Sequence, residues 1–338
     1  MEVLVLLLII IIFYKSKILK KGFNEDYLSL KSSKCYKGFL AIIILFHHIS
    51  QKVNPNLLFY KFSYVGYLAV AVFFFISGYG THKSYLKNDN YRKKFLQNKL
   101  INILYPYIIV TIIYVIYNKA HCNCYFVDNV FKYIINPNPI VSNSWYIIAL
   151  LEFNLMYYIS MNIFRNKKNL IIFPMIIFNI LYIMYFKNGP DIYWYNAVHL
   201  FNIGIIFAQY EKQIINFLKK YIYILLPVFY IIFYILFTTY YKEKLFEIQF
   251  ITSIVIVLLF ILINLKIKIN NKILLFLGKI SYELYMVQGL FLDIFRSRIY
   301  NIENDLYFTL LVIISSLVFA YLLHVILDFT KKIFKKFL

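Results

Sequence analysis

The sequence predicts an all-α integral membrane protein with ten core transmembrane helices, and three observations lead to that prediction. Of its 338 residues, 62% are hydrophobic and 15% are charged, whereas about 25% of the residues of a soluble domain are charged. The apolar residues form runs close to the about 20 residues that a helix needs to cross a bilayer. The segments between these runs alternate in charge. Together these observations exclude a water-soluble globular fold.

Ten apolar runs are candidates for membrane-spanning helices. In chain order they cover residues 37–53, 62–82, 99–118, 141–163, 169–186, 193–210, 220–240, 247–265, 273–296 and 306–328. A shorter apolar run at residues 3–14 precedes them. Glu2 stands before this run and lysines follow it, so it lacks the basic start of a signal peptide. We interpret it as a candidate extra short helix.

The charge of the connecting segments predicts the orientation, because Lys and Arg favour cytoplasmic loops. Every second segment is basic, and these are residues 15–37, 83–99, 165–168, 212–220, 266–272 and 331–336. The intervening segments carry fewer basic residues or balance them with acidic ones. We therefore expect a multi-pass protein of the cell (inner) membrane with both ends of the helical core in the cytoplasm.

We interpret the chain as one membrane domain. We divide it into residues 1–36, a short apolar segment and basic loop; residues 37–328, the ten-helix domain; and residues 329–338, a basic tail. The formal net charge of +21 is explained by cytoplasmic loops and anionic lipid. We expect membrane lipid as a partner and no nucleic acid.

The cysteines predict neither a disulfide framework nor a metal site. Only Cys122 and Cys124 share a loop, in the sequence His121-Cys122-Asn123-Cys124. One residue between two thiols is not the spacing of a zinc knuckle, and no second ligand pair follows. We expect no metal.

The stretch from Lys37 to His48 carries the most information about function. The two residues are eleven positions apart, so on a helix they lie within about 20° of one another and about 16 Å apart along the axis. A long anionic donor could lie along this face, with its phosphate at Lys37 and its reactive group near His48. His47 lies about 100° away round the helix, so His48 is the preferred histidine. Alternatively, Lys37 is only the basic flank of a helix and His48 an interfacial side chain.

More than one interpretation is open for each of several other polar or aromatic residues in the apolar runs. Glu152 needs a partner inside the membrane: it orients His48, faces a polar cavity, or pairs with a Lys or Tyr; Tyr282 and Glu283 have a similar status. Ser77 and Tyr79 lie among small residues that favour helix packing, or contact the substrate directly. Trp145 is an interfacial aromatic or stacks on a sugar ring.

Four segments of the chain carry a family resemblance, in the expected order. They are a basic residue, ten intervening residues and a histidine (Lys37 to His48), an FF-x-SG-Y helix (Phe74 to Tyr79), a W-Y-x-x-x-L helix (Trp145 to Leu150) and an LGxxSYxxY segment (Leu277 to Tyr285). The sequence resembles the acyltransferase-3 family of multi-pass membrane O-acyltransferases, which modify bacterial cell-surface glycans. The resemblance covers about residues 34–328.

The resemblance implies roles for these residues. By resemblance His48 would be catalytic, and we place Glu152 in the catalytic set as the carboxylate that could orient it. Lys37, Ser77 and Tyr79 would bind the donor, acyl-CoA, and we expect acetyl-CoA as a substrate with no bound cofactor. Trp145 and Tyr282 would bind the acceptor, a surface polysaccharide or lipid-linked glycan.

Three positions depart from the pattern of many members. Lys37 and Asn102 stand where many have Arg, and Gln288 stands where many have His. Lys keeps the charge of Arg but loses its bidentate grip on phosphate, so the departures affect the donor contacts more than His48. Two rivals to the acyltransferase remain: a transporter or flippase for a glycan or lipid intermediate, and a catalytically silent relative.

Overall fold

The computed structural model describes residues 2–56, 58–122, 139–189, 191–243, 245–269, 271–297 and 300–337. In these residues the regular structure is helical apart from two short strands, β1 (Ser16–Ile18) and β2 (Ile267–Ile269), which pair antiparallel. The prediction of an all-α membrane fold is therefore confirmed. The prediction of no metal at residues 121–124 concerns side chains outside the described part of the chain.

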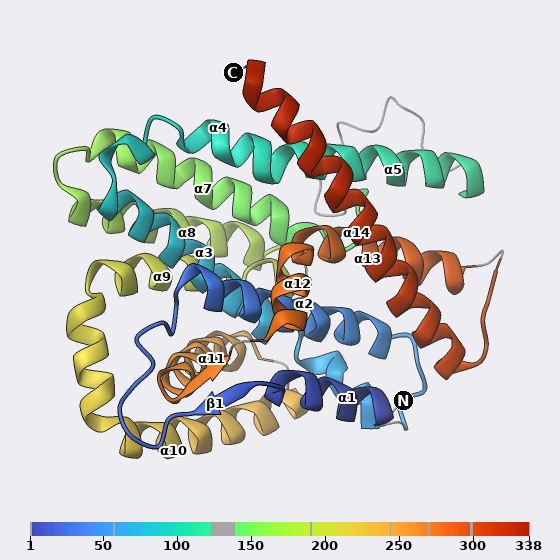
Figure 1. The fold of residues 1–338 in the computed structure, drawn as a ribbon, viewed down its shortest axis with the longest axis horizontal. Helices are drawn as coiled ribbons and strands as arrows, with labels where there is room; N and C mark the ends of the chain where they lie inside the picture. The colour runs from blue at the N-terminus through green and yellow to red at the C-terminus, as the bar shows by residue number, and fades with distance from the viewer. Residues whose placement is uncertain are drawn as a thin grey trace.

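Each predicted apolar run corresponds to a helix or to a pair of helices (Figure 1). The helices are α1 (Glu2–Phe13), α2 (Leu30–Ser50), α3 (Gly66–Lys87), α4 (Phe95–Lys99), α5 (Tyr105–Cys122), α7 (Trp145–Ile163), α8 (Ile172–Lys187), α9 (His199–Gln209), α10 (Glu211–Glu243), α11 (Phe246–Lys266), α12 (Lys272–Lys279), α13 (Ser281–Phe295) and α14 (Asp305–Phe337). A π-helical turn, Leu100–Leu104, joins α4 to α5.

The number of ten transmembrane helices is not confirmed. Among the described residues, six helices are long and apolar enough to cross a membrane, or seven if the bent pair α12–α13 counts as one span. Helix α9 has 11 residues and so a length of about 16 Å, and α12 and α13 meet at a bend of 71°. Helices α2 and α3 are long enough, with 21 and 22 residues, but their polar residues make them less apolar.

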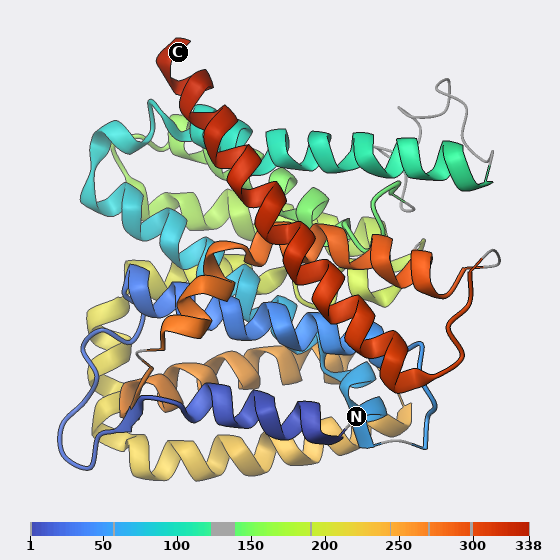
Figure 2. The ribbon, with the colours of Figure 1, turned by 45° about the vertical axis from the view of Figure 1, so that its right-hand side comes forward.

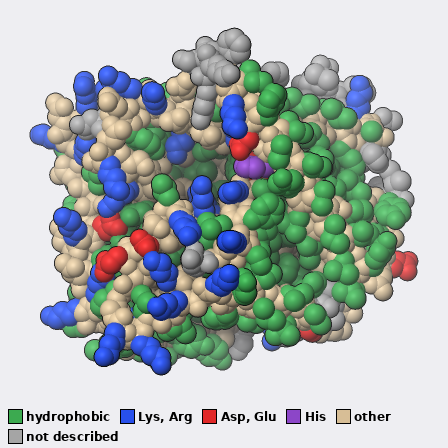
Figure 3. All heavy atoms as spheres, viewed as in Figure 1, with side chains coloured by type: hydrophobic (Ala, Val, Ile, Leu, Met, Phe, Trp, Pro, Cys, Tyr) green, Lys and Arg blue, Asp and Glu red, His purple; other side chains and the backbone are tan. Residues whose placement is uncertain are grey.

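The two ends of the helical bundle differ in charge. The loop before α2, the α3–α4 turn and the α7–α8 turn lie at one end, on the left in Figure 1, and the α2–α3 and α13–α14 connections lie at the other. The pairing of β1 with β2 brings the loops at residues 15–29 and 266–272 to the same end. Lys and Arg side chains gather at this end, and apolar side chains cover much of the rest of the same face (Figure 3). We call it the basic end; it holds loops that the charge alternation grouped together.

Glycines allow the backbones of α3 and α9 to pack closely in the core. A Cβ atom added to Gly78 of α3 would lie 2.0 Å from the Phe201 carbonyl oxygen of α9, and one added to Gly204 of α9 would lie 2.3 Å from the Phe75 carbonyl oxygen. Small residues at such crossings let helix backbones touch. Both views place α4 and α5 on the opposite side of the molecule from α1 and α10 (Figures 1 and 2), so α2 and α3 lie between them.

Candidate active site

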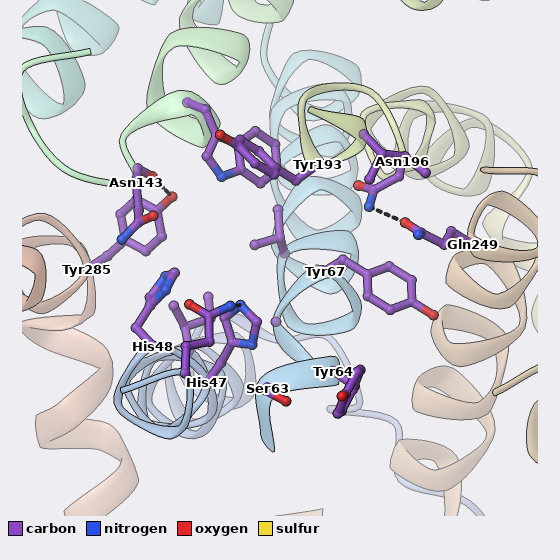
Figure 4. Close-up of a pocket in the computed structure, with 16 residues that line it drawn as sticks. His47, His48, Ser63, Tyr64, Tyr67, Asn143, Tyr193, Asn196, Gln249 and Tyr285 are labelled. Atoms are coloured by element: carbon purple, nitrogen blue, oxygen red, sulfur yellow. Dashed lines mark hydrogen bonds between the residues drawn. The ribbon is translucent and has the colours of Figure 1, made fainter. Parts of the chain in front are cut away.

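A cavity of about 280 Å³ lies near the end of the bundle opposite the basic end, and we call it the histidine pocket (Figure 4). It forms where α2 ends and where α3, α7 and α11 begin. Its lining is Ile44, His47, His48, Gln51, Ser63, Tyr64, Gly66, Tyr67, Val70, Asn143, Trp145, Ile192, Tyr193, Asn196, Gln249 and Tyr285. No Lys, Arg, Asp or Glu is among these residues. The pocket therefore suits an uncharged polar ligand.

The two adjacent histidines of this pocket differ in their bonding. The ring of His47 has a partner at each nitrogen: its Nδ1 lies 3.0 Å from the Phe62 carbonyl oxygen, and its Nε2 lies 3.2 Å from Nε2 of Gln51. The carbonyl requires Nδ1 to carry the proton, so Nε2 accepts from Gln51. The ring also packs on Gly66, where an added Cβ would lie 2.4 Å from it. His47 is thus held in place.

His48 lies beside His47, with its ring centroid 4.8 Å away. Its imidazole is directed toward Asn143 and Tyr285, across the pocket from η1 (Leu58–Tyr64) (Figure 4). The side chain is half-buried and lines the cavity. A neutral imidazole in this position can accept a proton from a bound hydroxyl.

Asn143 lies opposite His48 in an unusual backbone conformation. Its φ is 63°, in the left-handed region that Asn tolerates better than most residues. Its carbonyl oxygen accepts a hydrogen bond from the Tyr285 hydroxyl, which holds the turn before α7. The side-chain amide lies on the wall of the pocket, near His48 (Figure 4).

Aromatic rings form another wall of the histidine pocket. Trp145, the first residue of α7, is buried, and its ring lies 5.6 Å from that of Tyr193. The amides of Asn196 and Gln249 lie on the same side of the pocket and are bonded to each other at 2.6 Å. Aromatic faces beside amide groups are a surface on which a sugar ring can stack and bond.

A second cavity of about 400 Å³ lies toward the basic end, and we call it the lysine pocket. Its lining is Leu30, Lys37, Phe73, Ile76, Ser77, Gly80, Thr81, Tyr91, Lys99, Asn102, Ile103, Tyr146, Leu150, Ser281, Tyr282 and Tyr285. Lys37 comes from the first half of α2 and Lys99 from the end of α4. Lys99 donates to the Thr81 hydroxyl at 3.2 Å and lies over the ring of Phe95.

The lysine pocket has positive charge without a carboxylate among its lining residues. Two ammonium groups beside hydroxyl and amide groups favour an anion, because an uncompensated charge in a confined site needs a counter-ion. Phosphate oxygens fit these donors. The chemistry of the two pockets is therefore complementary.

The two pockets adjoin at Tyr285, which lines both. Its ring contacts that of Tyr146 at 5.6 Å, so two tyrosines stand between the cavities. Helix α2 is unbroken from Leu30 to Ser50, which keeps Lys37 and His48 about 16 Å apart along its axis. The arrangement suits a ligand with a phosphate group at one end and a reactive group at the other.

The structure separates the other candidate residues. Ser77 lies in the lysine pocket and Trp145 in the histidine pocket, as their expected roles require. Tyr282, expected to bind the acceptor, lies in the lysine pocket instead, and its hydroxyl donates to the Ile103 carbonyl oxygen at 2.9 Å. We therefore group Tyr282 with the donor side.

Two candidates lie outside both pockets. Tyr79 donates its hydroxyl to Glu211 at 2.8 Å, in a cluster that also includes Tyr27 and Lys83. Glu152, half-buried on α7, lies near Tyr182 of α8 and does not line the pocket of His48. Neither position supports the expected role in binding or catalysis.

Lys99 and Asn143 are among the pocket residues that the sequence analysis did not single out. In the sequence, Lys99 is an ordinary basic residue at the start of an apolar run. In the structure it supplies a second charge in the lysine pocket, one turn before Asn102. Asn143 stands two residues before Trp145 in a loop, where a polar side chain is common. Of the departures, Asn102 lies in the lysine pocket, whereas Gln288 is fully buried on α13 and lines neither pocket.

Comparison with known proteins places this arrangement in a family. Residues 31–325 match the family model described as the acyltransferase domain, Acyl_transf_3. The comparisons find no matching curated protein and no matching solved structure. The match includes α2 through most of α14, and with them both pockets. The chain therefore belongs to the acyltransferase-3 family of membrane acyltransferases.

Proposed function

We propose that this protein transfers an acetyl group from acetyl-CoA to a hydroxyl of a cell-surface polysaccharide or lipid-linked glycan. The basic end faces the cytoplasm of the cell membrane and receives the donor, and the glycan enters the histidine pocket from the opposite side. The observation that carries the proposal is the pair of adjoining pockets along α2, one with two lysines and one with His48.

The lysine pocket binds the diphosphate of the donor. Lys37 and Lys99 supply the charge, and no carboxylate lines this pocket to compete for it. Ser77, Asn102 and Tyr282 add polar groups to the same wall. The long arm of CoA then passes Tyr146 and Tyr285 and brings the thioester to His48.

His48 acts as the general base. Its neutral imidazole takes the proton of the acceptor hydroxyl as the oxygen attacks the thioester carbonyl. The new C–O bond forms and the carbonyl electrons move to the oxygen. When the tetrahedral intermediate collapses, the C–S bond breaks and the leaving sulfur takes the proton from the imidazolium, which regenerates the base.

Asn143 stabilises the oxyanion of that intermediate. Its amide lies across from His48 (Figure 4), and the Tyr285 hydrogen bond to its carbonyl fixes the turn that presents it. A preorganised amide donor aimed at developing charge lowers the barrier without reorganisation.

The acceptor lies on the aromatic and amide wall. Trp145 and Tyr193 offer ring faces to a sugar, and Asn196 and Gln249 offer hydrogen bonds to its hydroxyls. The absence of charged residues from the lining of this pocket suits a neutral carbohydrate. Lipid-linked and polymeric acceptors share this chemistry.

The test compares His48→Asn with His47→Asn in purified protein, by release of free CoA thiol in the presence of a glycan panel. An Asn amide can replace Nδ1 of His47 as the donor to Phe62, so this variant is a matched control. We expect His48→Asn to lose about 10²- to 10⁴-fold in kcat and His47→Asn to keep most activity. Thermal melts check that both variants fold.

Two outcomes would contradict the proposal. Equal turnover by wild type and His48→Asn would remove His48 from the mechanism. Glycan-dependent transport in vesicles, without thiol release for any acceptor, would favour a transporter.

A further inference from the structure

A third cavity, of about 450 Å³, opens at the basic end between α2 and α12, and we call it the α2–α12 cleft. Its lining is Leu30, Lys31, Lys34, Lys272, Leu275, Phe276 and Lys279. Four of these seven residues are lysines and none is acidic. Lys and Arg side chains gather over α12 and the first part of α2 (Figure 3).

The contact between two helices brings the lysines together. An added Cβ at Gly38 would lie 2.2 Å from the Leu274 carbonyl oxygen, and one at Gly278 would lie 1.9 Å from the Lys34 carbonyl oxygen. The backbones of α2 and α12 therefore touch, and larger residues at these positions would separate them. Lys31 and Lys34 share a face of α2, and Lys272 and Lys279 share a face of α12.

Helix α12 is also held at its beginning. The Asn271 side chain accepts from the backbone N–H groups of Ile273 and Leu274 and donates to the Ile11 carbonyl oxygen. This cap fixes the first turn of α12. The spacing of the lysines across the cleft is thus set by packed backbone.

Acidic residues of the neighbouring loop are paired elsewhere. Glu25 accepts from Lys219 at 2.6 Å, and Asp26 accepts from Lys268 at 2.7 Å. The hydrogen bond and charge of Lys268, and to a smaller extent the charge of Lys31 in the cleft, hold the pKa of Asp26 below its ordinary value. With four lysines and no acidic residue in its lining, the cleft stays net positive beside this one paired carboxylate, which favours an external anion.

The cleft adjoins the lysine pocket, since Leu30 lines both. Lys34 precedes Lys37 by one helical turn. Cationic side chains therefore follow α2 from the cleft to the lysine pocket, and His48 lies farther along the same helix. A ligand with phosphate groups at two separate points matches this arrangement.

We propose that the α2–α12 cleft binds the ribose 3′-phosphate of the CoA donor, while Lys37 and Lys99 bind its diphosphate. This inference depends on the proposed acyl-CoA donor. In CoA the thiol arm, the diphosphate and the phosphorylated ribose follow one another, in the same order as the histidine pocket, the lysine pocket and the cleft. Phe276, exposed on the cleft wall, offers a face for the adenine base.

The test measures Kd for CoA and for 3′-dephospho-CoA by calorimetry, with the protein in nanodiscs of neutral phosphatidylcholine. The wild type should bind CoA about tenfold more tightly, because one charge-assisted contact contributes about 1.5 kcal/mol. In the double variant Lys272→Gln/Lys279→Gln the two ligands should bind equally, at the wild-type Kd for 3′-dephospho-CoA.

The matched control is Lys212→Gln/Lys220→Gln, which removes two exposed lysines of α10 and the same net charge. This variant should keep the tenfold preference for CoA. A cleft variant that still prefers CoA tenfold would overturn the inference, and so would equal binding of both ligands by the wild type.

Two further outcomes separate this inference from its alternatives. If the cleft binds an anionic lipid headgroup instead, discs with phosphatidylglycerol would stabilise the wild type but not the cleft variant, and both would keep the preference for CoA. If the wild type binds neither CoA nor 3′-dephospho-CoA, the acyl-CoA donor itself is wrong and the inference falls with it.

Discussion

The lysine pocket and the histidine pocket adjoin along one helix but have opposite chemistry. The first has two lysines and no carboxylate in its lining, whereas the second has no Lys, Arg, Asp or Glu and is lined by imidazole, amide and aromatic groups. In the proposed mechanism, this difference separates the charge that holds the donor from the site where its acyl group reacts. A pocket without a carboxylate in its lining favours the neutral imidazole that the proposed mechanism needs.

The two pockets also account for polar residues in α2 and α3, which are long enough to span a membrane but are not among the six apolar spans of the described residues. Both helices contribute to each pocket, so some of their polar residues line cavities, whereas others, such as Tyr79, bond to neighbouring helices. Polar groups at membrane depth are tolerated where they line such spaces. If the two pockets have separate roles, variants in the lysine pocket and variants in the histidine pocket should change different kinetic constants.

The largest effect in these comparisons should come from Asn143. We expect Asn143→Asp to lower kcat about 10²- to 10³-fold with little change in the KM of either substrate, because an oxyanion donor acts in the transition state. The measurement is steady-state kinetics with thiol detection.

Asn143→Gly distinguishes this role from a conformational one. Glycine adopts the left-handed backbone of residue 143 without cost, so a purely conformational role predicts that Asn143→Gly retains activity. Loss of kcat in both variants, with unchanged melting temperatures, would support the oxyanion role. An active glycine variant would contradict it.

Substitution of the two lysines in the lysine pocket should have a smaller effect, and on the donor KM instead of kcat. We expect Lys37→Gln and Lys99→Gln each to raise the KM for acetyl-CoA about 10- to 100-fold, with acceptor KM unchanged. Lys37→Arg should keep a low donor KM because it keeps the charge. The control is Lys93→Gln, which changes an exposed lysine outside the pocket. If Lys37→Gln or Lys99→Gln instead lowered kcat without changing the donor KM, the two pockets would not have the separate roles proposed.

The sequence predicts the all-α membrane fold and the placement of Lys37 and His48 on one helix. The predicted spacing of Lys37 and His48 agrees with the structure because α2 is one continuous helix, and a helix fixes the axial distance between its residues. The count of ten spans is not confirmed because hydropathy does not reveal that α9 stops after 11 residues or that α12 and α13 bend by 71°.

Contacts between distant segments were harder to predict. Lys99 enters the lysine pocket, and Glu152 faces Tyr182 instead of His48, only through the packing of α4, α7 and α8. Asn143 needs the Tyr285 hydrogen bond from 142 residues away to take its position. No local spacing carries such information.

The smallest effect should come from Trp145, and it tests the acceptor side. We expect Trp145→Phe to raise the acceptor KM severalfold, because the smaller ring buries less apolar surface against a sugar, and to leave the donor KM unchanged. The chain's other tryptophan, Trp194, stacks on Phe186 at 5.2 Å, packs against Trp145 at 6.3 Å and does not line the pocket, so Trp194→Phe should change stability and raise the acceptor KM less than Trp145→Phe does. If Trp145→Phe instead raised the donor KM, the thioester would lie on the aromatic wall. The two pockets would then form one donor site, and the acceptor would bind elsewhere.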